Sequence, residues 1–285
     1  MKKTNKIGLI DTHCHIFYDK YKNDIYEVVN RAKKEKVDKI ICVGIDIETS
    51  KKSIKLSEKF ESIFATVGFH PHEAKNATNS YLDTIKSLLE IPKVVAIGEI
   101  GLDYYYKHTD KKQQIKVFRE QLELAKDLNL PVVIHNRESD DDLYDNIKNS
   151  KISKGVVHCF SSDVNFANKL FELGLIISFT GIITFSKELQ EVVKEIPMSK
   201  IMIETDSPYL TPIPFRGKRN EPYMVREIAK KIAEIKNLSF DEVVNVTTNN
   251  AKKLFKFQHW KFQSENLGDK ILSLIKISLI KLLKS

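Results

Sequence analysis

Eight short apolar segments recur along the chain and constrain its fold more than any other feature of the sequence. They are rich in Val and Ile and show no polar alternation, which is typical of strands buried on both faces of a parallel sheet. We expect strands at residues 7–10, 39–43, 63–67, 94–97, 132–134, 155–157, 175–179 and 201–203. The amphipathic segments between them predict helices at residues 25–34, 49–60, 81–89, 113–128, 141–147, 164–173 and 187–193.

This alternation of strands and helices predicts an α/β fold, the (β/α)8 or TIM barrel, whose usual length is about 250 residues. A doubly wound open sheet is the alternative, but no glycine-rich dinucleotide turn follows the first predicted strand. Proline and glycine in the segment after residue 205 indicate a long loop over the barrel mouth. Three further helices should complete the barrel, at residues 222–235, 240–246 and 249–255, with Ser239 as the cap of the second.

The last residues differ from the rest of the chain. We predict a barrel domain over residues 1–257 and a basic, helical C-terminal extension over 258–285. Residues 270–284 contain nine apolar residues and four lysines. This segment is too short and carries too much charge to span a bilayer. The apolar face of such a helix would pack on the barrel or on a partner chain, or lie on a membrane surface.

Composition predicts the cellular compartment but does not identify the substrate. The formal charge is +8, of which residues 256–285 hold +4 (six lysines against two acids), so the barrel is only mildly basic. A polyanionic partner is compatible with this charge and is not required by it. Three scattered cysteines, the lack of a signal peptide and the lack of a transmembrane segment predict a cytoplasmic protein. Two of the cysteines, Cys14 and Cys159, adjoin candidate ligands and should point away from them into the core.

Metal-ligand side chains follow the predicted strands. Residues 11–15 read Asp-Thr-His-Cys-His, and the two histidines share one side of an extended chain, so both can reach one ion. Other ligand-type residues end four further strands. The complete set is His13, His15, Glu99, His135, His158 and Asp206. Because the C-terminal strand ends of a (β/α)8 barrel meet at one face, we expect these side chains to converge there.

Such a set suits phosphodiester hydrolysis, which needs an activated water and neutralisation of oxygen charge. Two divalent cations about 4 Å apart, bridged by a carboxylate, supply both. The residues divide as His13, His15 and Asp206 for one ion, His135 and His158 for the other, and Glu99 as the bridge. The carboxylate of Asp206 is also placed to accept the proton of the attacking water, so Asp206 and Glu99 are the candidate catalytic residues.

Several motifs together give a family resemblance. They lie at residues 11–15, 68–72 (Gly-Phe-His-Pro-His), 98–104 (Gly-Glu-Ile-Gly-Leu-Asp-Tyr), 133–137 (Val-Ile-His-Asn-Arg), 158–160, 204–210 and 216–222. With them the chain resembles the TatD-type metal-dependent deoxyribonucleases of the amidohydrolase superfamily. The resemblance implies a two-metal (β/α)8 barrel that hydrolyses DNA, often as a 3′–5′ exonuclease on single strands, and implies the six ligands named above. It says nothing about the residues after Phe257.

Further polar residues are candidates for substrate binding or for support of the ligands. His70 and His72 could contact substrate or a third ion, or structure their loop, and His108 is expected to be exposed. Asp103 and Glu204 are interpreted as partners of the metal ligands. Four cations in the βα loops would contact phosphate or simply be solvated, namely Arg137, Arg216, Lys218 and Arg219.

Three functions remain open on the sequence alone. The first is a divalent-metal-dependent nuclease that acts on DNA, with RNA as a further possible substrate. The second is another hydrolase on the same site, such as a D-aminoacyl-tRNA deacylase or a small ester or amide hydrolase. The third is an inert barrel whose basic tail binds nucleic acid. Imidazole-rich ligation favours Zn or Mn by ligand type, whereas nucleases of this family generally use Mg, so the sequence leaves the metal as Mg, Mn or Zn.

Overall fold

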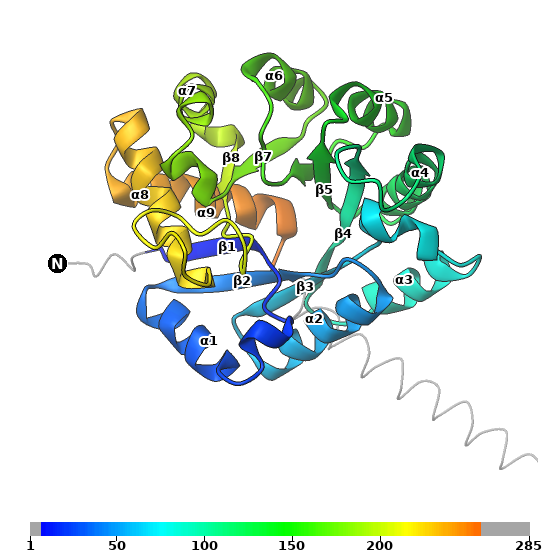
Figure 1. The fold of residues 1–285 in the computed structure, drawn as a ribbon, viewed down its shortest axis with the longest axis horizontal. Coiled ribbons are helices and arrows are strands. Elements are labelled where there is room, and N and C mark those ends of the chain that lie inside the picture. Colours follow the sequence, from blue (N-terminus) through cyan, green and yellow to red (C-terminus); the bar gives the residue numbers. More distant parts are fainter. Residues whose placement is uncertain (1–6, 258–285) are drawn as a thin grey trace, which may run out of the picture. The chain divides into compact units, whose positions relative to one another are not determined.

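A computed structural model describes residues 7–257, and their strands form one parallel sheet that closes on itself (Figure 1). The spatial order of the strands is their order in the chain, from β1 to β8. Their bounds are β1 Leu9–Cys14, β2 Val37–Val43, β3 Ile63–Val67, β4 Val94–Asp103, β5 Val132–Arg137, β6 Gly155–Val157, β7 Ile176–Phe179 and β8 Ile201–Ile203. The (β/α)8 barrel predicted from the sequence is confirmed.

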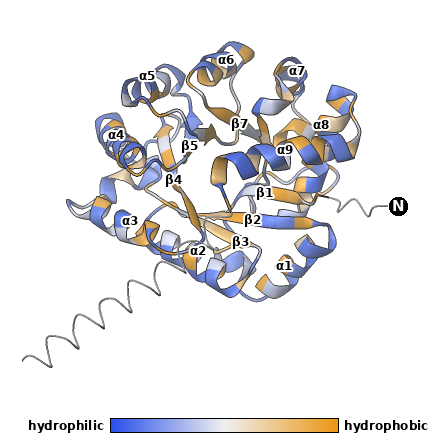
Figure 2. Cartoon of the chain, turned by 180° about the vertical axis from the view of Figure 1, so that it is seen from behind, coloured by the Kyte–Doolittle hydropathy of each residue, from blue (hydrophilic) through white to orange (hydrophobic). Residues whose placement is uncertain are grey.

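Helices surround the sheet and cover its outer face. The α-helices are α1 Ile25–Lys34, α2 Ile47–Lys59, α3 Tyr81–Leu89, α4 Lys111–Asp127, α5 Asp140–Ser150, α6 Val164–Glu172, α7 Lys187–Glu195, α8 Val225–Lys236 and α9 Phe240–Phe255. Short 3-10 helices lie at η1 Asp19–Tyr21, η2 Pro71–Asn76, η3 Gly181–Thr184, η4 Met198–Lys200 and η5 Pro222–Met224. Figure 2 shows largely hydrophobic strands and hydrophilic outer sides on the helices. Every residue of β1 and β3 is buried, as expected for strands between a barrel interior and a helical layer.

The ends of the barrel meet through β1 and the segment after β8. Cys14 pairs with Ser207, the amide of His15 donates to the carbonyl of Ser207 at 2.7 Å, and the amide of Asp206 donates to the carbonyl of His13 at 2.9 Å. The buried carboxylate of Asp11 accepts from the backbone and hydroxyl of Thr205 at 2.8 and 2.7 Å. Closure of the barrel therefore places Asp206 beside the two histidines at the end of β1.

Local side-chain bonds explain where the structure departs from the predicted helix limits. Helix α2 begins two residues early because Asp46 and Thr49 form a reciprocal capping box. Ser239 caps α9 as predicted, since its hydroxyl accepts from the amide of Glu242. The prediction of two helices within residues 240–255 is wrong. Thr247 and Thr248 are buried in one continuous helix and donate to the carbonyls of residues 243 and 8.

The predicted extension at 258–285 lies outside the described residues, so the domain boundary at residue 257 stays a prediction. Within residues 7–257, none of the helices combines the length and the apolar character needed to cross a bilayer.

Candidate active site

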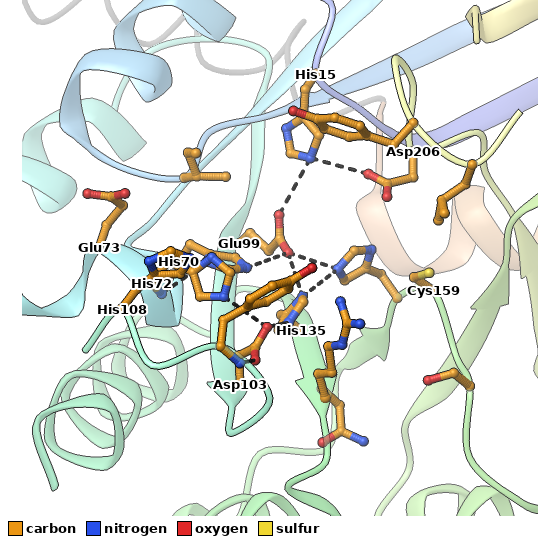
Figure 3. A pocket seen from close by; sticks show the side chains of 18 of the residues that line it. His15, His70, His72, Glu73, Glu99, Asp103, His108, His135, Cys159 and Asp206 are labelled. Carbon is orange, nitrogen blue, oxygen red and sulfur yellow. Dashed lines mark hydrogen bonds and ion pairs between the residues drawn. The ribbon is translucent and has the colours of Figure 1, made fainter. Parts of the chain in front are cut away.

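A cleft of about 690 Å³ opens at the C-terminal ends of the strands. Figure 3 shows His15 and Asp206 on one side of it, the His70, His72 and His108 group on the other, and Glu99 between them. Its lining also includes His135, His158, Asp103, Arg137, Tyr18, Tyr106 and Tyr209. The cleft lies where active sites of this fold are found.

Glu99, on β4, faces different histidines with its two carboxylate oxygens. Its Oε2 is 3.3 Å from Nε2 of His13 and 3.7 Å from Nε2 of His15. Its Oε1 is 2.8 Å from Nε2 of His158 and 3.1 Å from Nδ1 of His135. The carboxylate, only 3% exposed, therefore stands between two pairs of imidazoles.

The pair at the end of β1, His13 and His15, converges on a second carboxylate. The Nε2 atoms of His13 and His15 are 3.1 Å apart, and Oδ1 of Asp206 is 3.9 Å from the first and 3.4 Å from the second. Nδ1 of His15 is 2.9 Å from the carbonyl of Val43, which fixes the ring so that Nε2 points into the cleft. His13 lies on β1 and His15 directly follows it, with its amide still bonded to the carbonyl of Ser207, so both imidazoles point to this side while Cys14 between them is fully buried.

His70 joins the group from the loop after β3. Its Nε2 is 3.3 Å from Oε1 of Glu99, while its Nδ1 accepts from the amide of His72 at the start of η2. Burial lowers the pKa of His70 to about 4. The ring of His70 thus structures its loop, one of the roles considered from the sequence, and also faces the central carboxylate.

Opposed charges shape the pKa values of the cluster. Burial opposes ionisation of Glu99, but electrostatic interaction with the neighbouring histidines, His158 foremost, holds the pKa of its carboxyl well below the usual value. Burial equally opposes charge on His158, and the negative charge of Glu99 raises its pKa well above the usual value. Asp206 is buried too, yet its hydrogen bond with His15 lowers its pKa. Both carboxylates are therefore anionic and draw positive charge into the cleft.

The donor set fits divalent cations. Three groups of side chains have ligand atoms that all lie within 4.8 Å of one another. They are His13, His15 and Asp206; His13, Glu99 and His158; and His70, Glu99 and His135. Imidazole nitrogens and carboxylate oxygens are ligands for Zn and Mn, and carboxylates suit Mg. Five of the six ligands predicted from the sequence line this cleft, as does His70, and the sixth, His13, is fully buried with its Nε2 3.3 Å from Glu99.

Two buried carboxylates, those of Asp103 and Glu204, lie beside the outer nitrogens of two candidate ligand histidines. Oδ2 of Asp103 is 3.0 Å from Nε2 of His135 and 2.9 Å from Nε2 of His72. Oε1 of Glu204 is 3.4 Å from Nδ1 of His158, and this carboxylate also accepts from the hydroxyl of Ser178 at 2.6 Å. Such contacts orient imidazole ligands and raise their basicity. Both acids lie beside candidate ligand histidines, and their supporting role stays a prediction.

The path of β4 past β5 depends on Gly98. A Cβ at this position would lie 2.6 Å from Cβ of Val133, well inside van der Waals contact. Only glycine allows the backbone that carries Glu99 to approach β5 this closely.

The four candidate phosphate-binding cations are placed differently. Arg137 follows His135 by two residues on β5 and is the one Lys or Arg among residues 7–257 that lines the cleft. Arg216 lies on the ring of Phe185 and Lys218 near the ring of Phe215. Arg219 forms ion pairs with Asp24, at 2.6 Å, and with Glu221, at 2.8 Å. That network holds the loop after β8 against the start of α1 and leaves Arg219 outside the cleft lining.

Sequence reasoning missed the aromatic part of the cleft. Tyr18, Tyr106 and Tyr209 line it, and the run of three tyrosines directly after β4 was an unused signal. The expectation for Cys159 was wrong: it lines the cleft instead of packing away from it. Strand β6 ends at Val157, so strand alternation does not extend to Cys159, whose φ is +46°. His108 is exposed as expected and also lies at the cleft, with its ring 4.6 Å from that of His72.

A (β/α)8 barrel with this histidine and carboxylate cluster at its C-terminal face is typical of metal-dependent hydrolases. The sequence model described as "TatD related DNase" matches residues 10–256. The chain belongs to the TatD family.

Relatives and solved structures agree with this assignment. The chain is 44% identical over 252 residues to the "uncharacterized metal-dependent hydrolase YabD" of Bacillus subtilis, covering 87% of this chain and 99% of that protein. It is 34% identical over 264 residues to YcfH of Escherichia coli K12, described in the same words, with 90% and 98% covered. The crystal structure of the TatD homologue YjjV from E. coli K12 superposes with a TM-score of 0.83 at 31% identity, covering 87% of this chain and 98% of that one. A TatD-family hydrolase from Entamoeba histolytica gives a TM-score of 0.81 at 30% identity, with the same coverage.

Proposed function

We propose that this TatD-family hydrolase cleaves phosphodiester bonds of nucleic acid, mainly single-stranded DNA, from the 3′ end and with two divalent cations. The observation that carries the proposal is the position of Glu99, whose two oxygens face different pairs of histidines. A carboxylate so placed suits the bridge of a two-cation site, in which the ions lie about 4 Å apart. The description of the family as a DNase supports nucleic acid as the substrate.

The ligands divide between two positions. His13, His15 and Asp206 would hold one cation, and His135 and His158 the other, with Glu99 shared. Mg, Mn or Zn bound there would supply Lewis acidity toward a phosphoryl oxygen and acidify a water molecule.

Residues of the chain itself would do the remaining work. The carboxylate of Asp206 is 15% exposed, lies at the open side of the cluster and is held ionised, so it can accept the proton of the attacking water. Arg137 would attract and orient the phosphate backbone, because a guanidinium matches the geometry of phosphate oxygens. The polarity from the 3′ end and a secondary action on RNA belong to the same proposal.

We further propose the cytoplasm as the site of action. All three cysteines are free thiols, which fits a reducing compartment.

The test compares phosphodiester and acyl substrates. Purified protein is stripped with a chelator, reloaded with Mg, Mn or Zn, and given a single-stranded oligonucleotide, a D-aminoacyl-tRNA and a nitrophenyl ester. We expect metal-dependent cleavage of the oligonucleotide that EDTA and Glu99→Gln abolish. Glu90→Gln, the same change at an exposed position after α3, should keep full activity. Rapid acyl turnover with an intact oligonucleotide would contradict the proposal and favour the deacylase or esterase alternative.

A further inference from the structure

Exposed aromatic side chains gather at the mouth of the barrel. Among residues 7–257, eight large hydrophobic side chains are exposed, and five of them follow strands at the cleft end of the sheet. The five are Tyr105, Tyr106, Phe185, Tyr209 and Ile213. Aromatic rings left in water at the entrance of a cleft indicate a surface that a ligand covers.

The guanidinium of Arg137 lies over the rings of Tyr105 and Tyr106, between the cleft and solvent. These rings are 51% and 42% exposed, and the guanidinium carbon of Arg137 lies 4.0 Å from the centroid of the first and 4.8 Å from that of the second. Of the six arginines, all within residues 7–257, Arg137 is the one whose guanidinium has no hydrogen bond or ion pair to another described residue. Its N–H edge is therefore available to an anion, while the rings hold its plane.

This group is fixed relative to the metal-ligand cluster by Asp103. Oδ1 of Asp103 accepts from the amide of Tyr106 at 2.9 Å, while Oδ2 faces His135. Arg137 and His135 occupy the same side of β5, two residues apart. The ring of Tyr106 is further held edge-on to His72, at 5.4 Å. A phosphate on Arg137 thus has a set position relative to the hydrolytic centre.

The combination selects among phosphate-bearing ligands. A lone guanidinium would serve any phosphodiester, but two rings in water beside it suit a flat, apolar partner. An unpaired nucleobase offers such a face on the same nucleotide as a phosphate, whereas bases inside a duplex are already stacked.

We infer that Tyr105, Tyr106 and Arg137 form a nucleotide subsite, in which Arg137 binds a backbone phosphate and the tyrosine rings stack on an unpaired base beside the scissile bond. The inference rests on the proposed function and adds the residues that make the enzyme prefer single strands. A second pair on the opposite rim continues the path, since Lys20 lies 5.3 Å from the ring of Tyr209, which lines the cleft.

The test distinguishes binding of the bases from binding of the phosphates. Two single-stranded 5′-labelled oligomers of equal length are compared, one with normal bases and one built of abasic sugar phosphates. Stacking contributes about 1–3 kcal/mol per base, so the double variant Tyr105→Ala/Tyr106→Ala should raise KM for the normal oligomer about tenfold or more. KM for the abasic oligomer should rise by a clearly smaller factor, because Arg137 keeps its charge and loses only its support, so the preference for the normal oligomer should disappear. Arg137→Met should raise KM for both oligomers.

Two controls distinguish binding from support of the loop. Tyr105→Phe/Tyr106→Phe keeps both rings and should keep the preference for bases. Tyr26→Ala removes an equally exposed tyrosine, 4.1 Å from the ammonium of Lys59 on the outside of the barrel, and should change neither KM. A retained base preference in the double Ala variant, or equal KM values for both oligomers in the wild type, would overturn the subsite alone. Cleavage of neither oligomer by metal-loaded wild type would overturn the proposed nuclease function and the subsite together.

Discussion

Replacing Asp103 by Asn should weaken metal binding without touching any metal ligand. The carboxylate faces three donors: the amide of Tyr106 at 2.9 Å on one oxygen, and the rings of His72 and His135, at 2.9 and 3.0 Å, on the other. An amide has one oxygen and places an NH2 group where the second oxygen stood, so at least one N–H donor meets another donor. The negative charge that raises the basicity of His135 is lost as well.

The size of the effect follows from these contacts. Hydrogen bonds to a charged group contribute about 1.5–3 kcal/mol each, and only part of the loss reaches the metal through His135. Loss of an outer partner of a ligand histidine typically costs about 10- to 100-fold in metal affinity, or roughly 1.4–2.7 kcal/mol. We therefore expect the metal concentration for half-maximal rate to rise by that factor, and most of kcat to return at saturating metal.

Metal affinity is measured by competition with a chromophoric chelator, beside the rate as a function of metal concentration. The matched control is Asp110→Asn on the same loop, where the side chain caps α4 through the amide of Gln113 and Asn caps equally well. Unchanged metal affinity in Asp103→Asn would refute the reasoning. So would a lost rate that saturating metal fails to restore.

Two further predictions concern support of the site and of its loop. Glu204→Gln should lower metal affinity about tenfold, because His158 loses the negative charge beside its Nδ1. An unchanged affinity in the same competition assay would show that this contact does not contribute to metal binding. Asp24→Asn should lower the melting temperature by about 1–3 °C at pH 7. Hydrogen bonds from Arg219 first and Arg31 next hold the pKa of Asp24 below its usual value, so its stabilisation is complete above about pH 4 and is lost as pH falls through the folded-state pKa. The difference in melting temperature should therefore shrink in acid, and a constant difference down to pH 2 would contradict the assignment.

The sequence located every strand of the barrel, because continuous runs of Val and Ile have few other uses in a chain of this composition. It placed strand ends poorly. Strand β4 was expected to stop at residue 97, where apolar character ends, yet it runs to Asp103 and pairs Gly101 with His135 and Asp103 with Arg137. Hydrogen bonding between the strand backbones continues through the polar residues of the site. A pattern of apolar residues cannot predict where such backbone pairing ends.

The candidate ligands were predictable for a different reason. A barrel brings all C-terminal strand ends to one face, so one fold prediction brings six distant side chains into one cluster. That they bind metal stays a prediction. Side-chain direction on loops was not predictable. Arg219 and Arg137 both looked like loop cations, and only the structure shows that Asp24 and Glu221 engage the first while the second lines the cleft. The prediction for Cys159 was wrong because β6 ends at Val157, so the alternation of side chains along a strand does not apply two residues later.

A time course on single-stranded DNA labelled at its 5′ end tests the central claim most directly. Metal-loaded wild type is compared with the same protein in EDTA and with Asp206→Asn, which removes the proposed proton acceptor and one ligand. The account predicts a ladder that shortens from the 3′ end and is absent in both controls. Intact DNA in the presence of wild type with two metal ions bound per chain would contradict it.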